Sequence, residues 1–178
     1  NLLKKHKKIV SKTETVNLSK TKGRILAEDL KSKINLPPFN NSAVDGYAIL
    51  KTDLYKNITL TCSKRIAAGD NKKIKIKKGE TVRIFTGAKM PSNSSTIVMQ
   101  ENTIKKGNKI CILKVPKLGE NYRLMGEDIK RNKIILKKGN VVNQQNINLI
   151  AAVGITKIKV FKKVQIGYFT SGNELKSP

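Results

Sequence analysis

The middle of the chain alternates apolar and polar residues with a period of two, which is typical of half-buried β-strands. The segments that follow this pattern are 58–62, 74–77, 81–85, 96–99 and 109–114. Glycine-containing turns at 78–80 and 106–108 separate some of these segments, as expected for short strands joined by tight connections. The pattern therefore predicts a compact, β-rich and barrel-like module over residues 33–131.

Mixed patterns flank this module on both sides. Residues 143–153 place Ile147, Ile150 and Ala151 on one face, which predicts a helix that ends at Gly154. Further segments are a helical face at 2–10, strands at 13–16 and 158–161, and a strand with a turn at 133–140. The chain is therefore expected to be α+β.

The last apolar segment behaves differently. Residues 163–169 form a strand pattern that ends in Thr170, Ser171 and Gly172, and the chain stops soon afterwards. A strand that ends in small residues is how an α/β nucleotide-type domain opens its first crossover, and backbone N–H groups at such a turn can bind an anion. We therefore expect a further module to begin here and to be cut short.

The net charge of the chain is +25, from 37 Lys and Arg residues against 12 Asp and Glu residues. Such a charge is compatible with a nucleic acid or an anionic membrane as partner. However, lysine greatly outnumbers arginine, and no aromatic residues are interleaved with the lysines. Proteins that bind nucleic acids commonly use arginine for bidentate contacts and aromatic rings for stacking. We therefore attribute the lysines to an AT-rich coding sequence, and keep nucleic-acid binding as an alternative.

The rest of the composition argues against several other kinds of site. Cys62 and Cys111 form no C-x-x-C pair, so zinc binding is not expected, and reduced cysteines suit a reducing compartment such as the cytoplasm. His6, the single histidine, lies among lysines and is expected to be solvated. No apolar run is long enough to span a membrane, and the first residues carry no signal-peptide pattern.

Four turns place carboxylates or hydroxyls beside glycine and stand apart from the lysine-rich background. They are 35–48 with Ser42 and Asp45, 83–91 with Thr86 and Gly87, 121–128 with Arg123 and Asp128, and 170–174 with Glu174. A carboxylate beside a glycine can be approached closely by a ligand, and binding groups gather on the loops of a rigid scaffold. Each turn taken alone is better explained as structural, with Arg123 paired to Asp128, but four such turns together favour a binding site.

Six segments in colinear order carry a resemblance to a known family. They are 23–29, 37–48, 83–88 with Met90 and Pro91, 98–101, Asn121 with Arg123 and 126–129, and 169–175. With these segments the chain resembles the molybdopterin molybdenumtransferase family, which includes bacterial MoeA and the E domain of gephyrin. The chain departs from the family at Asn40 and Asn173, where Asp is common, and at Leu124 and Met125, where Arg is frequent.

The resemblance implies a multidomain, elongated protein that forms a homodimer. Residues 1–32 and 132–163 would form a discontinuous first domain, a small mixed α/β linker module. Residues 33–131 would be the inserted β-rich second domain. Residues 164–178 would begin a Rossmann-like, molybdopterin-binding third domain, and the rest of that domain and a fourth would lie outside the chain. The chain alone is therefore expected to be inactive.

The resemblance also implies a cytoplasmic enzyme of molybdenum cofactor biosynthesis. It would insert molybdate into adenylylated molybdopterin with the help of Mg²⁺ and release AMP. Its expected partners are a second subunit, the pterin and molybdate, and the adenylyltransferase of the preceding step, but neither a membrane nor a nucleic acid. Breaking a phosphoanhydride beside an oxyanion needs a cation and groups that place it. The alternatives are a basic nucleic-acid-binding module and a dimerisation or scaffold module without catalysis.

The catalytic residues that the resemblance implies are Asp45, Thr86, Asp128 and Glu174. In the family the cleft lies between the second module of one subunit and the third and fourth modules of its partner. The pterin phosphate would be held by hydroxyls, amides and a guanidinium, from Ser42, Gly87, Arg123, Thr170, Ser171 and Gly172. Carboxylates can hold magnesium, but the metal ligands are left unassigned.

Overall fold

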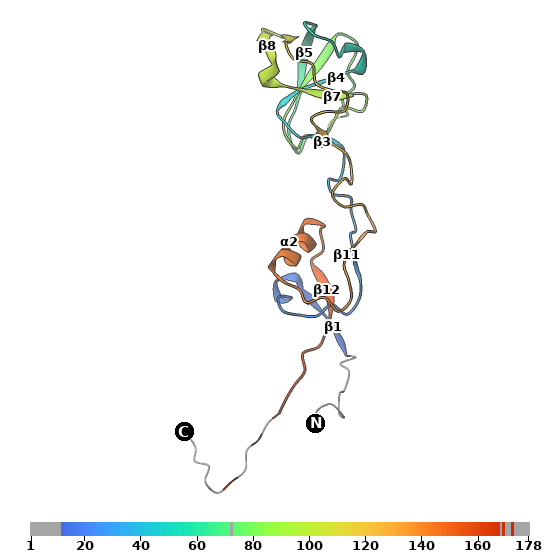
Figure 1. The fold of residues 1–178 in the computed structure, drawn as a ribbon, viewed down its shortest axis with the longest axis vertical. Helices are drawn as coiled ribbons and strands as arrows, with labels where there is room; N and C mark the ends of the chain where they lie inside the picture. Colours follow the sequence, from blue (N-terminus) through green and yellow to red (C-terminus); the bar gives the residue numbers. More distant parts are fainter. Residues whose placement is uncertain (1–11, 72, 168, 170–171, 173–178) are drawn as a thin grey trace. The chain divides into compact units, whose positions relative to one another are not determined.

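The computed structural model describes residues 12–71, 73–167, 169 and 172 of the chain. The chain divides into two compact units, which we call unit 1 (within residues 1–31 and 134–178) and unit 2 (residues 32–133) (Figure 1). Unit 2 is thus an insertion in unit 1, because the chain leaves unit 1 and returns to it. The helical face expected over 2–10 lies outside the described residues.

Unit 1 contains two short antiparallel strand pairs. β1 (Thr13–Asn17) pairs with β12 (Lys157–Phe161), and β2 (Leu30–Lys31) pairs with β11 (Ile134–Leu136). The strands predicted over 13–16 and 158–161 are therefore confirmed. A short 3-10 helix, η1 (Leu18–Lys20), follows β1 directly.

The helix α2 (Gln144–Ala152) confirms the helix predicted over 143–153. The side chains of Asn143 and Asn146 each accept a hydrogen bond from the backbone N–H of the other, which forms a capping box. Gly154 follows the helix with a φ of 75°, a left-handed conformation in which glycine carries no steric cost. Ile150, which is fully buried, anchors the helix in unit 1.

Unit 2 is built on a six-stranded sheet with the strand order β7-β4-β6-β5-β9-β8. The strands are β4 (Gly46–Ile49), β5 (Thr59–Ile66), β6 (Glu80–Ile84), β7 (Thr96–Met99), β8 (Thr103–Lys106) and β9 (Lys109–Ile112). β5 and β6 are parallel, and the other neighbours are antiparallel. Outside this sheet lie the pair β3 (Asn41–Ser42) with β10 (Tyr122–Arg123) and the 3-10 helices η2 (Lys51–Asp53) and η3 (Gln100–Asn102).

The sheet of unit 2 curls so that its two edges approach each other. The edge strands β7 and β8 are consecutive in the chain and are joined only by η3. Because an extended residue spans at most about 3.6 Å, so short a connection brings the ends of the two edges within roughly 15 Å. Unit 2 is therefore a curled half-barrel, and the described chain is mostly β with one α-helix.

The two faces of this sheet are both partly apolar but differ at one end. One face carries a cluster that includes Ala48, Val82, Ile84 and Ile97, and the other carries Ile49, Leu60, Val98 and Ile112. Tyr47 lies two residues before Ile49 and pairs in register with both Val98 and Arg83. Alternation therefore puts Tyr47 and Arg83 on the face of the second cluster, where the apolar core gives way to polar groups.

The strand predicted over 74–77 is wrong. Ile76 is buried, but its N–H and carbonyl bond to the side chain of Asn93, at 3.0 and 2.7 Å, instead of to a neighbouring strand. Alternation thus correctly predicted that Ile76 is buried, but the hydrogen bonds of its backbone go to a side chain and not to a strand. Conversely, β8 was not predicted, because its single apolar residue, Ile104, lies among lysines on an edge strand, a composition that discourages further strand pairing.

The strand pattern over 163–169 is not a regular strand in the described part of that segment. Val164, Ile166 and Phe169 are exposed by 63%, 81% and 91%, and no described strand of the chain pairs with this segment. A strand needs such a partner for its backbone groups.

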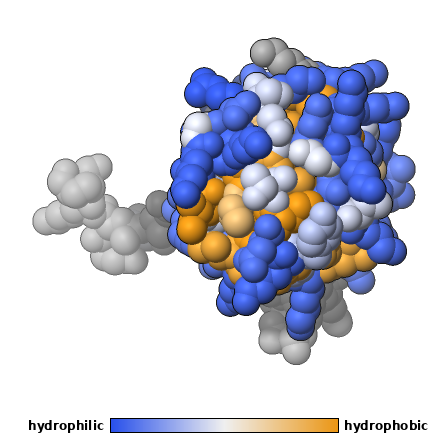
Figure 2. Space-filling view, turned by 90° about the horizontal axis from the view of Figure 1, so that it is seen from above, coloured by the Kyte–Doolittle hydropathy of each residue, from blue (hydrophilic) through white to orange (hydrophobic). Residues whose placement is uncertain are grey.

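Hydrophilic side chains dominate the rim of the face shown in Figure 2. No helix among the described residues has the length and apolar character to cross a membrane.

Candidate active site

Asp45 lies where a turn leads into β4, and the backbone on both sides of it is fixed. Before it, the Ser42 hydroxyl donates to the Val44 carbonyl and accepts from the Val44 N–H, at 3.3 Å for the latter, which closes a local turn. After it, Gly46 packs so closely on β7 that a Cβ would lie 2.1 Å from the Val98 carbonyl oxygen. Only glycine fits there, so these neighbours set the position of Asp45.

Thr86 contacts Asp45 directly. Asp45 Oδ1 accepts hydrogen bonds from the Thr86 N–H at 2.8 Å and from the Thr86 hydroxyl at 2.7 Å. The turn after β6 that carries Thr86 is held by Gly87, which has a φ of 79° and donates its N–H to the Ser42 carbonyl at 2.8 Å. The structure therefore brings four of the sequence-predicted residues into one cluster.

These hydrogen bonds favour the ionised form of Asp45. The backbone N–H of Thr86, and then its hydroxyl, lower the pKa of Asp45 below its usual value of 3.8, and the charge of Arg83 adds to this effect. Both donors reach Oδ1, and the described residues provide no hydrogen bond to Oδ2. Asp45 thus combines a fixed position with a free anionic oxygen, which suits it to orient a polar substrate atom by accepting a hydrogen bond.

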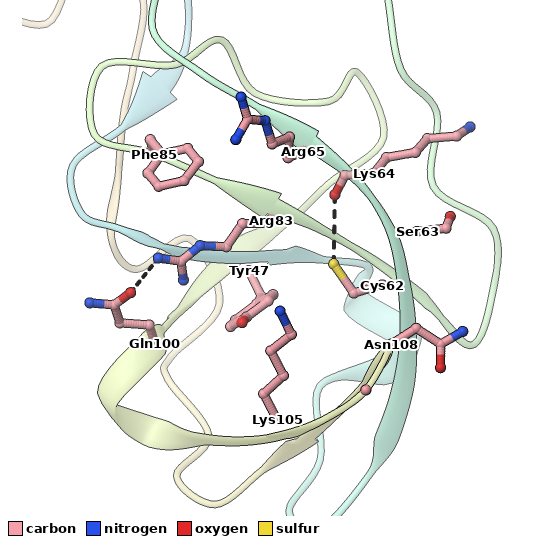
Figure 3. A pocket seen from close by; sticks show the side chains of 11 residues that line it. Tyr47, Cys62, Ser63, Lys64, Arg65, Arg83, Phe85, Gln100, Lys105 and Asn108 are labelled. Atoms are coloured by element: carbon pink, nitrogen blue, oxygen red, sulfur yellow. Dashed lines mark hydrogen bonds between the residues drawn. The ribbon is translucent and has the colours of Figure 1, made fainter.

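A pocket of about 660 Å³ opens beside this pair (Figure 3). Its lining includes four cationic side chains and two aromatic rings, those of Lys64, Arg65, Arg83, Lys105, Tyr47 and Phe85. Among the residues that the structure describes, no carboxylate lines it. Thr86 directly follows Phe85, so the pocket and the Asp45–Thr86 pair adjoin, and the pocket attracts anions toward the pair.

Arg83 is held firmly at this junction. Its guanidinium lies 5.1 Å from the ring centroid of Tyr47 and 5.0 Å from that of Phe85, within the range of cation–π attraction. Its Nη2 also donates to Gln100 Oε1. Tyr47, Phe85 and Gln100 were not predicted as site residues, because the sequence was searched for aromatic residues next to lysines along the chain and not for residues on a common strand face.

Alternation along the strand could have indicated part of this group, because it puts Arg83 and Phe85 on the same face.

Arg123 and Asp128 form a separate cluster. Arg123 Nη2 donates to both carboxylate oxygens of Asp128, at 2.7 and 2.6 Å, and Nε donates to Glu127 at 2.5 Å. Arg123, followed by the Leu124 N–H, lowers the pKa of Glu127 below its usual 4.5. Within the described part of the chain, no hydrogen bond joins Asp128 to Asp45 or Thr86. The pairing of Arg123 with Asp128 agrees with the structural alternative from the sequence.

The other predicted site residues belong to the end of the chain. Glu174, Thr170 and Ser171 lie outside the described residues, and Gly172 is exposed. Asn40, one of the departures from the family, accepts a hydrogen bond from the Met125 N–H at 2.7 Å through its side-chain oxygen. An aspartate there could accept the same bond.

The described residues do not by themselves fit a magnesium site. They contain no group of three or more His, Cys, Asp or Glu residues placed to hold a metal ion, whereas magnesium favours several oxygen ligands. Asp45 offers one free oxygen. Arg83 lies close enough to affect it electrostatically, which disfavours a second positive charge at that point.

The sequence of this chain is similar to those of known proteins. The family model for the MoeA N-terminal region, domains I and II, matches residues 1–154. The molybdopterin molybdenumtransferase of Haemophilus influenzae is 35% identical over 166 residues, covering 93% of this chain and 41% of the relative. That of Staphylococcus epidermidis is 35% identical over 179 residues, covering 98% of this chain and 42% of the relative. The chain thus spans about two fifths of the length of these relatives.

Solved structures give the same result. Two crystal structures of the molybdopterin biosynthesis MoeA protein from Pyrococcus horikoshii superimpose with TM-scores of 0.82 and 0.78, each at 34% identity. They cover 91% and 84% of this chain, and the chain covers 43% and 41% of theirs. The match of sequence and fold across most of its length shows that this chain belongs to the MoeA family, as its N-terminal region.

Proposed function

We propose that this chain is the N-terminal part of an enzyme of molybdenum cofactor biosynthesis, which inserts molybdate into adenylylated molybdopterin and releases AMP. The observation that carries the proposal is the Asp45–Thr86 pair beside the cationic pocket, in a chain of the MoeA family. The relatives' names supply the reaction class, and the pair supplies a fixed, ionised group for it.

The proposed reaction breaks the phosphoanhydride that joins the pterin phosphate to AMP: a water oxygen forms the new bond to the pterin phosphorus, AMP leaves with the bridging oxygen, and a proton of the water passes to solvent. Substrate and molybdate are both anionic, so the positive field of the pocket raises their local concentration. Thr86 uses its N–H and its hydroxyl hydrogen on Asp45, which leaves Oδ2 of the carboxylate to orient the attacking water or another polar substrate atom. Asp45 and Thr86 thus act as a single unit in this proposal.

The remaining parts of the site are proposed on the resemblance alone. We propose that residues 164–178 begin a third domain, in which Glu174 and the Thr170–Ser171–Gly172 turn complete the site from the partner subunit of a homodimer. Asp128 and Arg123 are kept as a proposed second group of substrate contacts. Magnesium would neutralise phosphate charge when bound, but the described residues supply no site for it, and no step is routed through it.

The wider setting is also a proposal. We place the protein in the cytoplasm, in keeping with the free cysteines Cys62 and Cys111, and in contact with the adenylyltransferase of the preceding step. The 178-residue chain alone is proposed to be inactive, because half of the cleft would come from other domains. Release of AMP by the isolated chain would contradict this.

The proposal is tested by replacing the Asp45 carboxylate with its isosteric amide in the full-length protein that carries this chain. Asp45→Asn should reduce the rate of AMP release by about 100-fold, the typical effect of losing a group that orients a reacting atom. Glu28→Gln is the matched control, since it removes the same charge from unit 1, where Glu28 has only a 3.8 Å exposed ion pair with Lys159. Equal rates for the two variants would refute the proposed role of Asp45.

A further inference from the structure

The pocket beside Asp45 contains more positive charge than the catalytic pair uses. Arg65 and Arg83 are direct register partners in the β5–β6 ladder, so their side chains leave the same face of the sheet on strands about 4.8 Å apart. Lys105 lines the same pocket from β8, the far edge of the curled sheet. Figure 3 shows its amine directed inward, whereas the side chain of Lys64 extends away. Three strands therefore supply three cations to one pocket.

These cations form no direct ion pair with a described residue, although Arg83 lies close enough to Asp45 to act on its charge. Among the described residues, no carboxylate forms an ion pair with Arg65, Arg83 or Lys105. Arg83 is also fixed in advance by the rings of Tyr47 and Phe85. A cation that is already ordered loses little conformational freedom when a ligand binds. The entropic cost of binding an anion at Arg83 is therefore small.

A split in the sheet gives this anion room. β9 pairs with β5 only from Thr59 to Thr61, and the last contact is the Cys62 N–H donating to the Asn108 carbonyl at 2.7 Å. Residues 63–66 of β5 then continue along β6 alone, so the β8–β9 turn diverges from them. The pocket lies in this gap, with Asn108 in its lining.

We propose that this pocket binds a diphosphate through Arg65, Arg83 and Lys105. Guanidinium groups bind phosphate oxygens through paired hydrogen bonds, and three cations on one side match a polyanion better than a single phosphate. The inference rests on the proposed function, because the substrate proposed there joins its pterin phosphate to AMP through a diphosphate. It adds which part of that substrate this unit binds, and through which side chains.

The test is calorimetric titration of the 178-residue chain with inorganic pyrophosphate and with inorganic phosphate. Pyrophosphate should bind saturably and about tenfold more tightly than phosphate, because it engages one more charge-assisted contact. Arg65→Ala with Lys105→Ala should weaken pyrophosphate binding by about tenfold or more. Lys114→Ala with Lys117→Ala removes the same charge from exposed positions outside the pocket and should change the affinity less than about twofold.

Equal weakening by the two double variants would overturn the proposal, since it would show a diffuse effect of surface lysines. Absence of saturable binding, or equal affinity for phosphate and pyrophosphate, would also overturn it. If a variant does not fold, backbone amide NMR of the unmodified chain decides: pyrophosphate should shift the signals of residues 62–65 and 105–108 and leave those of Lys114, Val115 and Lys117 unchanged. Failure here with a large effect of Asp45→Asn on AMP release would sink the diphosphate site but not the proposed function.

Discussion

Asp45 and Asp128 both lie in turns of unit 2 and both accept hydrogen bonds, but their donors differ. Asp45 is held by the neutral N–H and hydroxyl of Thr86, whereas Asp128 is held by the guanidinium of Arg123. The first arrangement leaves a net negative charge beside a cationic pocket. In the second, the guanidinium bonds both carboxylate oxygens of Asp128, so neither oxygen is left without a donor. The presence of a carboxylate in a turn therefore does not decide whether it can contact a ligand. What decides is whether its hydrogen-bond donors leave one carboxylate oxygen free, as Thr86 does for Asp45, or occupy both, as Arg123 does for Asp128.

The proposed difference between Asp45 and Asp128 would be contradicted if the two carboxylates were equally important for turnover. We expect Asp128→Asn to reduce AMP release by less than about tenfold, against about 100-fold for Asp45→Asn, because Asp128 is already paired with Arg123. Steady-state rates of the full-length protein at saturating substrate measure this. A larger loss for Asp128→Asn than for Asp45→Asn would reverse the assignment.

The two clusters also differ in how rigidly glycine is required beside them. In Gly46→Ala the new Cβ would lie 2.1 Å from a backbone carbonyl oxygen, so the free energy of unfolding should fall by about 3 kcal/mol or more. In Gly126→Ala the Cβ would lie 3.1 Å from the side chain of Asn35, at a φ of 73°, and the loss should be about 1–2 kcal/mol. Urea unfolding of the 178-residue chain measures both, and equal losses would contradict the packing described around Asp45.

Removing one donor from each cluster gives a smaller effect. Thr86→Val deletes the hydroxyl but keeps the backbone N–H, so turnover should fall about fivefold, as for the loss of one hydrogen bond. Arg123→Gln should leave turnover within about twofold, since its main partners are Glu127 and Asp128. If Arg123→Gln were the more damaging of the two, the second cluster would be the principal contact with substrate.

Thr86→Val also makes a prediction about pH. The folded-state pKa of Asp45 is depressed, so its contribution to stability is present above the unfolded pKa and disappears as the pH falls through the folded pKa. Thr86→Val reduces this depression. The free energies of unfolding of wild type and variant should therefore differ by a pH-dependent amount. This amount should be present at neutral pH and disappear in acid. Urea titrations at neutral and acidic pH test this.

Much of the fold could be predicted because alternation and turn chemistry are local. The strands around 81–85, 96–99 and 109–114 and the helix over 143–153 followed from period and glycine alone. The failure at 74–77 had a non-local cause, because the side chain of Asn93, seventeen residues away, took the backbone hydrogen bonds of Ile76. The periodicity of a segment does not indicate that a distant side chain will take its backbone hydrogen bonds.

The candidate site shows the same limit. Asp45 and Thr86 could be singled out from small residues in turns and from the family resemblance, but the pocket beside them could not. Tyr47, Arg83 and Arg65 form a row across three strands, and that row exists only once the order β4-β6-β5 is known. Strand order depends on long-range pairing, which one sequence does not specify by its local pattern.

The most direct measurement of the central claim is the salt dependence of two pKa values, followed by NMR of the side-chain carboxyl carbons. The account predicts a pKa for Asp45 below 3.8 that changes little with added salt, since neutral donors hold the carboxylate. The pKa of Glu127 should rise toward 4.5 as salt screens Arg123. A pKa of Asp45 at or above 3.8, or one that follows salt as that of Glu127 does, would contradict the claim that Thr86 keeps this carboxylate ionised and available.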